Sequence, residues 1–394
     1  MTKIAVITAA TNTIPRFRID MIDEFVRRGC EVVVFGDEPE EEWTEYFSSH
    51  EVGYRRYRVS RNGTNPIADI KTQYELRSLL RSERPDKVFT YQAKPNIYGT
   101  LAARSAGIEE VYVMMGGLGS VFHAGDARSR AVRKVVSMQY RRAFKNVRSA
   151  FFQNSEDVKL FEDLGIVDHA KVVMLRGSGV NLGQYPMRPL PTKTSFLFVG
   201  RLVRGKGVFD YLEAARIVKS IHPEVEFHLV GPFDTNPTAL KPEELRQYID
   251  DGTVEYEGEK KPNEVQPCLE RCSCFVLPSY YGEGTPKSAL EAMATGRPLI
   301  VADAVGCREV VRDGENGFFV PPRDPEVIAE AMTRLIDDPA LAARMSEASR
   351  RMAEKLFDVR KVNDVICKTM GITTQMDILL EVSEIQESEK RFRC

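Results

Sequence analysis

The sequence predicts an α/β protein of two domains, each built on a doubly wound parallel sheet. Short apolar runs alternate with helix-forming segments in both halves of the chain, which is the pattern of βαβ units. A chain of 394 residues is also longer than one ordinary domain. A stiff polar segment, Pro-Met-Arg-Pro-Leu-Pro at 186–191, separates the halves. We therefore expect domains at 1–188 and 189–357, then a helix and tail at 358–394 that packs in part on the first domain.

The first half predicts strands and helices in alternation. Compact apolar runs indicate buried strands, and the longer periodic segments between them indicate helices. The expected strands are 4–8, 31–35, 87–91, 110–115, 150–153 and 172–175. The expected helices are 16–28, 66–84, 96–105, 125–149 and 155–164. Ser155 is expected to cap the last of these, and the acidic segment 37–45 to be a solvated loop.

The second half repeats the alternation. The expected strands are 195–199, 226–230, 254–256, 273–277 and 299–301. The expected helices are 208–221, 286–295, 324–337 and 339–356. Between these elements, the glycine-rich segment 309–318 is expected to fold back as a turn. In such sheets, ligands bind beyond the carboxyl ends of the strands, so the loops after the strands are the places to search for function.

The bulk composition excludes several function classes. A net charge of −2 gives no general attraction to nucleic acid, and no apolar run approaches the ~18 residues of a membrane span. The chain opens on a strand and not on a signal peptide. Its seven cysteines lack the spacing of a zinc site and are expected to be reduced. The first strand is not followed by Gly-x-Gly-x-x-Gly, which argues against a dinucleotide enzyme.

The stretch 278–296 is the most informative loop after a strand. Pro286 suits the first position of a helix, and Gly296 suits its end. The backbone amides of Gly284 and Thr285 are then expected to point outward, ready for an anion such as a diphosphate. Two carboxylates, Glu283 and Glu291, flank this position and could accept hydrogen bonds from sugar hydroxyls. The alternative is a helix start with two surface glutamates.

The turn at 200–207 offers positive charge at another strand end. Its spacing from Gly200 to Lys206 matches a P-loop, but Gly207 stands where that motif needs Ser or Thr for magnesium. Arg201 and Lys206 would still place two cations beside a diphosphate. The first half has comparable loops at 8–12, 91–96 and 115–120, where a plain tight turn is an equally good interpretation.

The segment 125–149 predicts a basic amphipathic helix. Apolar residues recur at helical spacing, and eight basic residues face a single acid, Asp126. At about 100° per residue, five basic side chains fall on one narrow face. These are Arg130, Lys134, Arg141, Lys145 and Arg148. Such a face suits anionic headgroups, although an ordinary solvated helix also carries many charges.

Together these motifs resemble the retaining glycosyltransferases of family 4, which have the GT-B fold of two Rossmann-like domains facing a central cleft. The resemblance covers about residues 1–370, and it rests on Gly200-Arg201 with Lys206-Gly207, Glu283-Gly284-x-Pro286 with Glu291, and Asp313-Gly314-x-Asn316-Gly317. It implies catalytic roles for Glu283, Arg201 and Lys206. The implied nucleotide-sugar site comprises Gly200, Arg201, Lys206, Glu283, Gly284, Thr285, Pro286 and Glu291.

The first half carries four further motifs: Arg16-Phe17-Arg18, Lys94-Pro95-Asn96, Gly117-Leu118-Gly119-Ser120 and Gly177-x-Gly179-Val180-Asn181. These resemble the subgroup of the family that extends sugars linked to polyprenyl diphosphates. Many members of the wider family carry a histidine where this chain has Gln92 and Lys94. The implied acceptor-binding residues are Arg18, Lys94, Asn96, Gly117, Gly119 and Ser120. The implied membrane-binding residues are Arg130, Arg133, Lys134, Arg141 and Lys145.

The resemblance therefore implies a retaining transferase of bacterial glycan assembly that works without a metal ion or cofactor. It would move an N-acetylhexosamine or hexose, with N-acetylgalactosamine favoured, from a UDP-sugar to a polyprenyl-diphosphate-linked saccharide. We expect a cytoplasmic protein bound peripherally to the anionic inner face of the plasma membrane, with no nucleic-acid partner. The alternatives are a non-hydrolysing UDP-sugar epimerase and an inactive membrane-surface scaffold.

Overall fold

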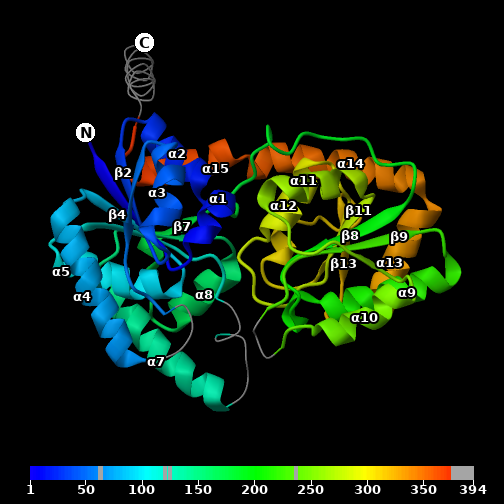
Figure 1. The fold of residues 1–394 in the computed structure, drawn as a ribbon, viewed down its shortest axis with the longest axis horizontal. Helices are drawn as coiled ribbons and strands as arrows, with labels where there is room; N and C mark the ends of the chain where they lie inside the picture. Colours follow the sequence, from blue (N-terminus) through cyan, green and yellow to red (C-terminus); the bar gives the residue numbers. More distant parts are fainter. Residues whose placement is uncertain (61–64, 119–121, 123–126, 235–237, 374–394) are drawn as a thin grey trace, which may run out of the picture.

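The computed structural model describes residues 1–60, 65–118, 122, 127–234 and 238–373. Two parallel sheets lie side by side with helices on their faces, one sheet in each half of the chain (Figure 1). Every strand pairing in both sheets is parallel. Each connection therefore runs from the carboxyl end of one strand back to the amino end of the next, through a helix or loop. The predicted α/β class with two doubly wound sheets is confirmed.

The N-terminal sheet has the strand order β3-β2-β1-β4-β5-β6-β7. Its strands are β1 Lys3–Ile7, β2 Glu31–Gly36, β3 Val52–Arg56, β4 Lys87–Tyr91, β5 Glu110–Met114, β6 Ser149–Phe152 and β7 Val172–Met174. Its helices are α1 Ile14–Phe17, α2 Ile19–Arg27, α3 Glu40–Ser48, α4 Pro66–Glu83, α5 Thr100–Ser105, α7 Ala127–Phe144 and α8 Ser155–Asp163. The strand order reverses between β1 and β4, and a crevice opens there beyond the strand ends.

The C-terminal sheet has the order β10-β9-β8-β11-β12-β13 and reverses between β8 and β11. Its strands are β8 Ser195–Val199, β9 Glu226–Val230, β10 Glu255–Tyr256, β11 Cys274–Leu277, β12 Leu299–Ala302 and β13 Gly317–Val320. Its helices are α9 Val208–Ile221, α10 Pro242–Asp250, α11 Pro262–Arg271, α12 Lys287–Ala294, α13 Pro325–Asp337 and α14 Pro339–Met352.

The end of the chain crosses back to the N-terminal domain. After α14, a π-helical turn at Ala353–Phe357 leads into α15, Val359–Thr369, which packs against α2 (Figure 1). Ile366 and Cys367 of α15 lie in the same apolar core as Phe25 of α2. The two domains are thus connected twice, by the linker near residue 188 and by this crossing.

Several local expectations were wrong, and each has a physical reason. The acidic segment 37–45 is helical from Glu40 onward, because Phe47 is buried and stacks on Tyr54 with ring centres 5.0 Å apart. The helix expected at 16–28 breaks at Arg18, whose φ is −134°. The cap of α8 is Asn154, whose side chain accepts a hydrogen bond from the amide of Asp157, in place of Ser155. Contacts between aromatic rings and side-chain caps determine where these helices begin and end. The periodicity of apolar residues does not report such contacts.

The basic helix is shorter than expected. α7 ends at Phe144, so Lys145 and Arg148 lie beyond it and do not extend its basic face. Val135, one of the apolar residues at helical spacing, is 52% exposed, because the domain core contacts the side of α7 that carries Tyr140 and Phe144.

Candidate functional site

A cavity of about 600 Å³ lies between the two domains, where the carboxyl ends of the strands of both sheets face each other. The C-terminal wall consists of the loops after β8, β9 and β11, at 199–201, 230–232 and 281–288. The N-terminal wall consists of the segment 16–18 and single residues that follow β4, β5 and β6. In both sheets, the place where the strand order reverses faces this one space. Doubly wound domains bind their ligands at such places.

The two walls touch through glycine backbones. Gly117, after β5, has φ +102°, and a Cβ atom there would lie 2.5 Å from the amide nitrogen of Gly284. A side chain at Gly117 would therefore push the two domains apart. We expected this glycine to let a ligand approach; in the structure it lets the opposite domain approach. Two other residues of the same loop, Gly119 and Ser120, lie outside the described residues.

Lys206 and Glu283 form an ion pair on the cavity wall. The ammonium group of Lys206 donates to Glu283 Oε1, and Ser279 Oγ donates to the same oxygen at 2.9 Å. Burial alone would raise the pKa of Glu283, but the charge and hydrogen bond of Lys206, with help from Ser279 and Arg201, hold that pKa below its usual 4.5. Glu283 is therefore a carboxylate at neutral pH, held beside a cation.

Arg201 supplies a second positive charge at the end of β8. Its Nη1 donates to Asp234 Oδ2 at 2.9 Å, and its guanidinium carbon lies 5.1 Å from the centre of the Tyr281 ring. The ammonium nitrogen of Lys206 lies 5.8 Å from the same ring. Two of the predicted cations thus meet around one aromatic ring, as the turn at 200–207 indicated.

The helix start at α12 is occupied by the other domain. The amide of Thr285 donates to Gln153 Oε1 at 2.9 Å, so it does not point freely at the cavity as expected. Gln153 follows β6, and its side chain is buried. Pro286 precedes α12 as its N-cap and is not its first residue. An anion at this helix start has to replace the amide oxygen of Gln153.

Glu291 is fully buried and does not line the cavity. Its two carboxylate oxygens accept from Arg16, with Nε to Oε1 at 3.1 Å and Nη2 to Oε2 at 2.5 Å. Arg16 does line the cavity, and it lies between that space and Glu291. Sequence reasoning missed Arg16 as a site residue. The available signal was its place two residues before Arg18, in the connection between β1 and α2.

Two of the expected acceptor-binding residues serve the N-terminal fold. Lys94 pairs with Asp69, Nζ to Oδ1 at 2.6 Å, and neither residue lines the cavity. The amide nitrogen of buried Asn96 donates to the carbonyl of Met114 at 2.9 Å, and its oxygen accepts from Thr90 at 2.7 Å. These bonds tie the helix start after β4 to α4 and β5, so both side chains are engaged within the N-terminal domain. Arg18 and Gly117, by contrast, do line the cavity.

The exposed side of α7 combines charge with apolar groups. Arg130, Lys134 and Arg141 are exposed, and Arg133 is half-buried. Val135 and Met138 are exposed among them, at 52% and 61%. The helix runs along the lower edge of the N-terminal domain in Figure 1. We define the α7 surface as Arg130, Arg133, Lys134, Val135, Met138 and Arg141.

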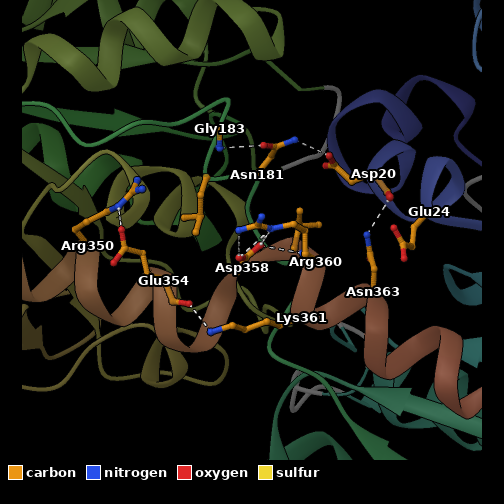
Figure 2. A pocket seen from close by; sticks show the side chains of 12 residues that line it. Asp20, Glu24, Asn181, Gly183, Arg350, Glu354, Asp358, Arg360, Lys361 and Asn363 are labelled. Atoms are coloured by element: carbon orange, nitrogen blue, oxygen red, sulfur yellow. Dashed lines mark hydrogen bonds and ion pairs between the residues drawn. The ribbon is translucent and has the colours of Figure 1, made fainter. Parts of the chain in front are cut away.

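A second cavity, of about 730 Å³, lies where the linker meets the crossing chain (Figure 2). Its polar groups are largely paired with one another. Asn181 donates to Asp20 Oδ1 at 2.8 Å, Asn363 donates to the Asp20 carbonyl at 2.9 Å, and Arg360 pairs with Asp358 at 2.7 Å (Figure 2). This network joins the domains and offers a ligand few free partners, so we assign the functional site to the cavity between the strand ends.

No described helix is both long and apolar enough to cross a membrane. Within the described ranges, no three His, Cys, Asp or Glu side chains gather where they could hold a metal ion. The six cysteines of those ranges are buried and unpaired, which agrees with the expectation of reduced core residues.

Two family models match the chain, one for each domain. Residues 188–352 match the glycosyl transferases group 1, and residues 17–177 match the glycosyl transferase 4-like domain. Over 359 residues the chain is 27% identical to the N,N'-diacetylbacillosaminyl-diphospho-undecaprenol alpha-1,3-N-acetylgalactosaminyltransferase of Campylobacter jejuni, covering 88% of this chain and 92% of that protein. It is 26% identical to the UDP-Gal:alpha-D-GlcNAc-diphosphoundecaprenol alpha-1,3-galactosyltransferase of Escherichia coli, covering 76% and 79%.

Solved structures share the architecture. Sucrose-phosphate synthase from Thermosynechococcus elongatus superposes with a TM-score of 0.75 at 19% identity, covering 93% of this chain and 98% of that one. Anabaena HepE in complex with UDP-glucose superposes with a TM-score of 0.76 at 16% identity, covering 95% and 100%. At these identities the likeness establishes the fold.

Proposed function

The chain belongs to the glycosyl transferases of group 1 and has the GT-B fold, and we propose that it moves a sugar from a UDP-sugar to a saccharide linked to a polyprenyl diphosphate. The observation that carries this proposal is the cluster of Arg201, Lys206 and Glu283 at the cavity between the domains. Both relatives named above act on undecaprenyl-diphosphate-linked sugars, one as an N-acetylgalactosaminyltransferase and one as a galactosyltransferase. N-acetylgalactosamine is our favoured sugar, because the first of them matches along nearly the whole chain.

The C-terminal wall supports a UDP-sugar as the first substrate. HepE, which shares the fold, has been solved with UDP and with UDP-glucose. In this chain the diphosphate would lie against Arg201 and Lys206, since charge-assisted hydrogen bonds to phosphate are strong and both side chains meet at Tyr281. Glu283 would accept a hydrogen bond from a hydroxyl of the transferred sugar.

The chemistry that follows is electrostatic. As the sugar leaves, negative charge grows on the β-phosphate of UDP, and Arg201 and Lys206 would stabilise that charge more strongly than they stabilise the bound substrate. Lys206 pairs with Glu283 in the structure, so it would exchange that carboxylate for the diphosphate when the UDP-sugar binds, which would release Glu283 for the sugar. The acceptor hydroxyl would attack from the face that the UDP leaves, with its proton passing to the departing phosphate, so the configuration is retained. No step in this sequence uses a metal ion or cofactor.

Glu291 would bind the ribose hydroxyls only after an exchange of partners. Its oxygens are both held by Arg16, so UDP has to displace that guanidinium or share the carboxylate with it. Likewise, the amide of Thr285 would exchange its acceptor, Gln153 Oε1, for an oxygen of the diphosphate. Nucleotide binding would therefore loosen contacts between the domains.

The second substrate determines where the enzyme works. A polyprenyl chain stays in the bilayer, so the enzyme would bind the membrane from the cytoplasmic side. The α7 surface is our candidate for this contact, because it presents basic groups for anionic lipids together with exposed Val135 and Met138.

The test is a mass-spectrometric screen of UDP-sugars, with and without a polyprenyl-diphosphate-linked saccharide. We expect transfer only when both substrates are present. Conversion of one UDP-sugar into another without acceptor would identify an epimerase instead. Failure of any UDP-sugar or UDP to bind in calorimetry would contradict an enzymatic role altogether.

A further inference from the structure

Arg18 is a buried cation on the wall of the cavity, and no carboxylate pairs with it among the described residues. It is 5% exposed and lines the space between the domains. Its Nη1 donates to the Phe17 carbonyl at 3.1 Å, and its Nε has no hydrogen-bond partner. The guanidinium carbon lies 5.1 Å from the centre of the Tyr91 ring. An aromatic face and a neutral carbonyl are thus its recorded partners.

This arrangement is unfavourable without a further partner. Buried charges in proteins are ordinarily paired, because removing a cation from water costs more than a neutral contact returns. Burial lowers the pKa of Arg18 to about 10, with a small opposing effect from Tyr91, so the side chain is still charged at neutral pH. The other arginines of this cavity are paired: Arg16 with Glu291, and Arg201 with Asp234.

A second buried cation accompanies Arg18. Lys287, the first residue of α12, is 8% exposed, lines the same cavity, and donates through Nζ to the carbonyl of Gly179 at 2.7 Å. Burial lowers its pKa, Glu291 and Asp20 oppose that shift, and Arg16 and Arg18 add to it. Lys287 and Arg18 thus line one cavity from different domains, and the charge of Arg18 lowers the pKa of Lys287.

We propose that Arg18 and Lys287 form a second anion subsite, which holds the diphosphate of the lipid-linked acceptor. The diphosphate of the UDP-sugar already has Arg201 and Lys206 at the end of β8. Arg18 comes from the N-terminal wall, after β1, and its buried guanidinium keeps an unused donor, Nε, that an anion could fill. The acceptor brings the only other diphosphate of the reaction. The inference rests on the proposed function for its ligand.

Binding to the protein saturated with UDP tests the subsite directly. Farnesyl diphosphate serves as the probe, and calorimetry on the full chain measures its affinity. Arg18→Gln removes one charge-assisted contact. It is expected to weaken the binding of farnesyl diphosphate roughly ten- to hundred-fold and to leave the affinity for UDP unchanged. Lys287→Gln is expected to act in the same direction. The control is Arg104→Gln, which removes an exposed arginine of α5 outside the cavity.

The outcomes separate this subsite from its alternatives. A loss of UDP affinity in Arg18→Gln as large as in Arg201→Gln would assign the guanidinium to the UDP-sugar and overturn the proposal. Unchanged affinity for farnesyl diphosphate, or no binding by the wild type, would overturn it too. If the probe binds through Arg18 while no sugar is transferred to any lipid-linked acceptor, the subsite stands and the proposed function fails.

Thermal unfolding without ligand supplies a second measurement. Arg18→Met keeps the aliphatic body of the side chain and removes the unpaired charge. We expect its Tm to rise, and farnesyl diphosphate to raise the Tm of the wild type but not of this variant. A lower Tm in Arg18→Met would mean that the guanidinium holds the fold together through Phe17 and Tyr91, and the anion subsite would be rejected.

Discussion

Arg16 of the N-terminal domain and Glu291 of the C-terminal domain form a buried ion pair with two hydrogen bonds. The separations are 3.1 Å from Nε to Oε1 and 2.5 Å from Nη2 to Oε2, and the carboxylate is fully buried. The pair joins α1 to α12 beside the cavity, which Arg16 lines. It therefore stabilises the docked arrangement of the domains and withholds Glu291 from a nucleotide.

The first prediction concerns this pair. Arg16→Met should lower the free energy of unfolding by about 3 kcal/mol, because Glu291 is left buried without its partner. The double variant Arg16→Met with Glu291→Leu should recover most of that loss, since apolar side chains replace both charges. Urea unfolding measures both.

A matched control for this pair comes from a second contact between the domains. Arg176 and Glu309 also pair across the boundary, at 3.3 Å, but the arginine is half-exposed. Arg176→Met should therefore cost no more than ~1 kcal/mol. Equal losses in the two single variants would show that burial of Glu291 contributes nothing special.

The second prediction separates binding from turnover. Lys206→Met should weaken UDP binding roughly ten- to hundred-fold, since it removes a charge-assisted contact to the diphosphate. Glu283→Gln should reduce kcat much more than it weakens UDP, because its proposed partner is the sugar. Calorimetry with UDP and steady-state kinetics give the two quantities. Normal turnover in a folded Glu283→Gln variant would remove Glu283 from the mechanism.

The third prediction is a pH dependence. The pKa of Glu283 lies below 4.5 in the folded protein, so its ionised form stabilises the fold at neutral pH. That contribution is lost as the pH falls below 4.5 and through the folded pKa. Lys206→Met removes the main cause of the lowering and leaves burial, which raises the pKa. The acid limb of its kcat/KM profile, which reports the free enzyme, should therefore move to higher pH, and an unmoved limb would contradict the ion pair as the cause.

The fourth prediction is that transfer does not need a metal ion. The proposed charge stabilisation uses two side-chain cations, Arg201 and Lys206, at the diphosphate. Activity should therefore be the same in EDTA and in magnesium. Activity that disappears in EDTA and returns with magnesium or manganese would replace this part of the mechanism.

The fifth prediction tests the α7 surface. Reversing Arg130, Lys134 and Arg141 to Glu should weaken binding to anionic liposomes by roughly 100-fold or more, at about 1 kcal/mol per basic residue near the surface. Transfer to a long-chain lipid acceptor should slow, while UDP affinity stays the same. Sedimentation with liposomes measures the binding.

The control for that experiment reverses three exposed basic residues elsewhere, Lys159, Arg344 and Arg351, with side chains 77%, 66% and 65% exposed. The same change in net charge then falls on α8 and α14. Equal loss of liposome binding in both triple variants would indicate a general charge effect and leave the α7 surface without a specific role.

Local patterns were sufficient to predict most elements. The turn at 200–207 and the helix after it illustrate this, because α9 was expected at 208–221 and occupies Val208–Ile221. The strands at 195–199 and 226–230 were likewise placed as observed. Apolar periodicity and glycine positions act within a few residues, so they can be read along the chain. Lys206 and Glu283 were singled out for the same reason, since each lies in the turn after a recognisable strand, but their ion pair was not predicted.

What the sequence alone determined is therefore most of the alternating strands and helices, the two doubly wound sheets, and the positions of the cationic turn and the glutamate turn. It did not predict β3, β13, α3, α10 or α11. Only the tertiary structure decided how those turns are used. In the folded protein the amide of Thr285 donates to Gln153, Glu291 pairs with Arg16, and Lys94 pairs with Asp69. Arg16 and Glu291 are 275 residues apart, and their contact depends on how two separate surfaces dock. Local periodicity records which side of an element is buried, but it carries no information on which distant group will meet a buried charge.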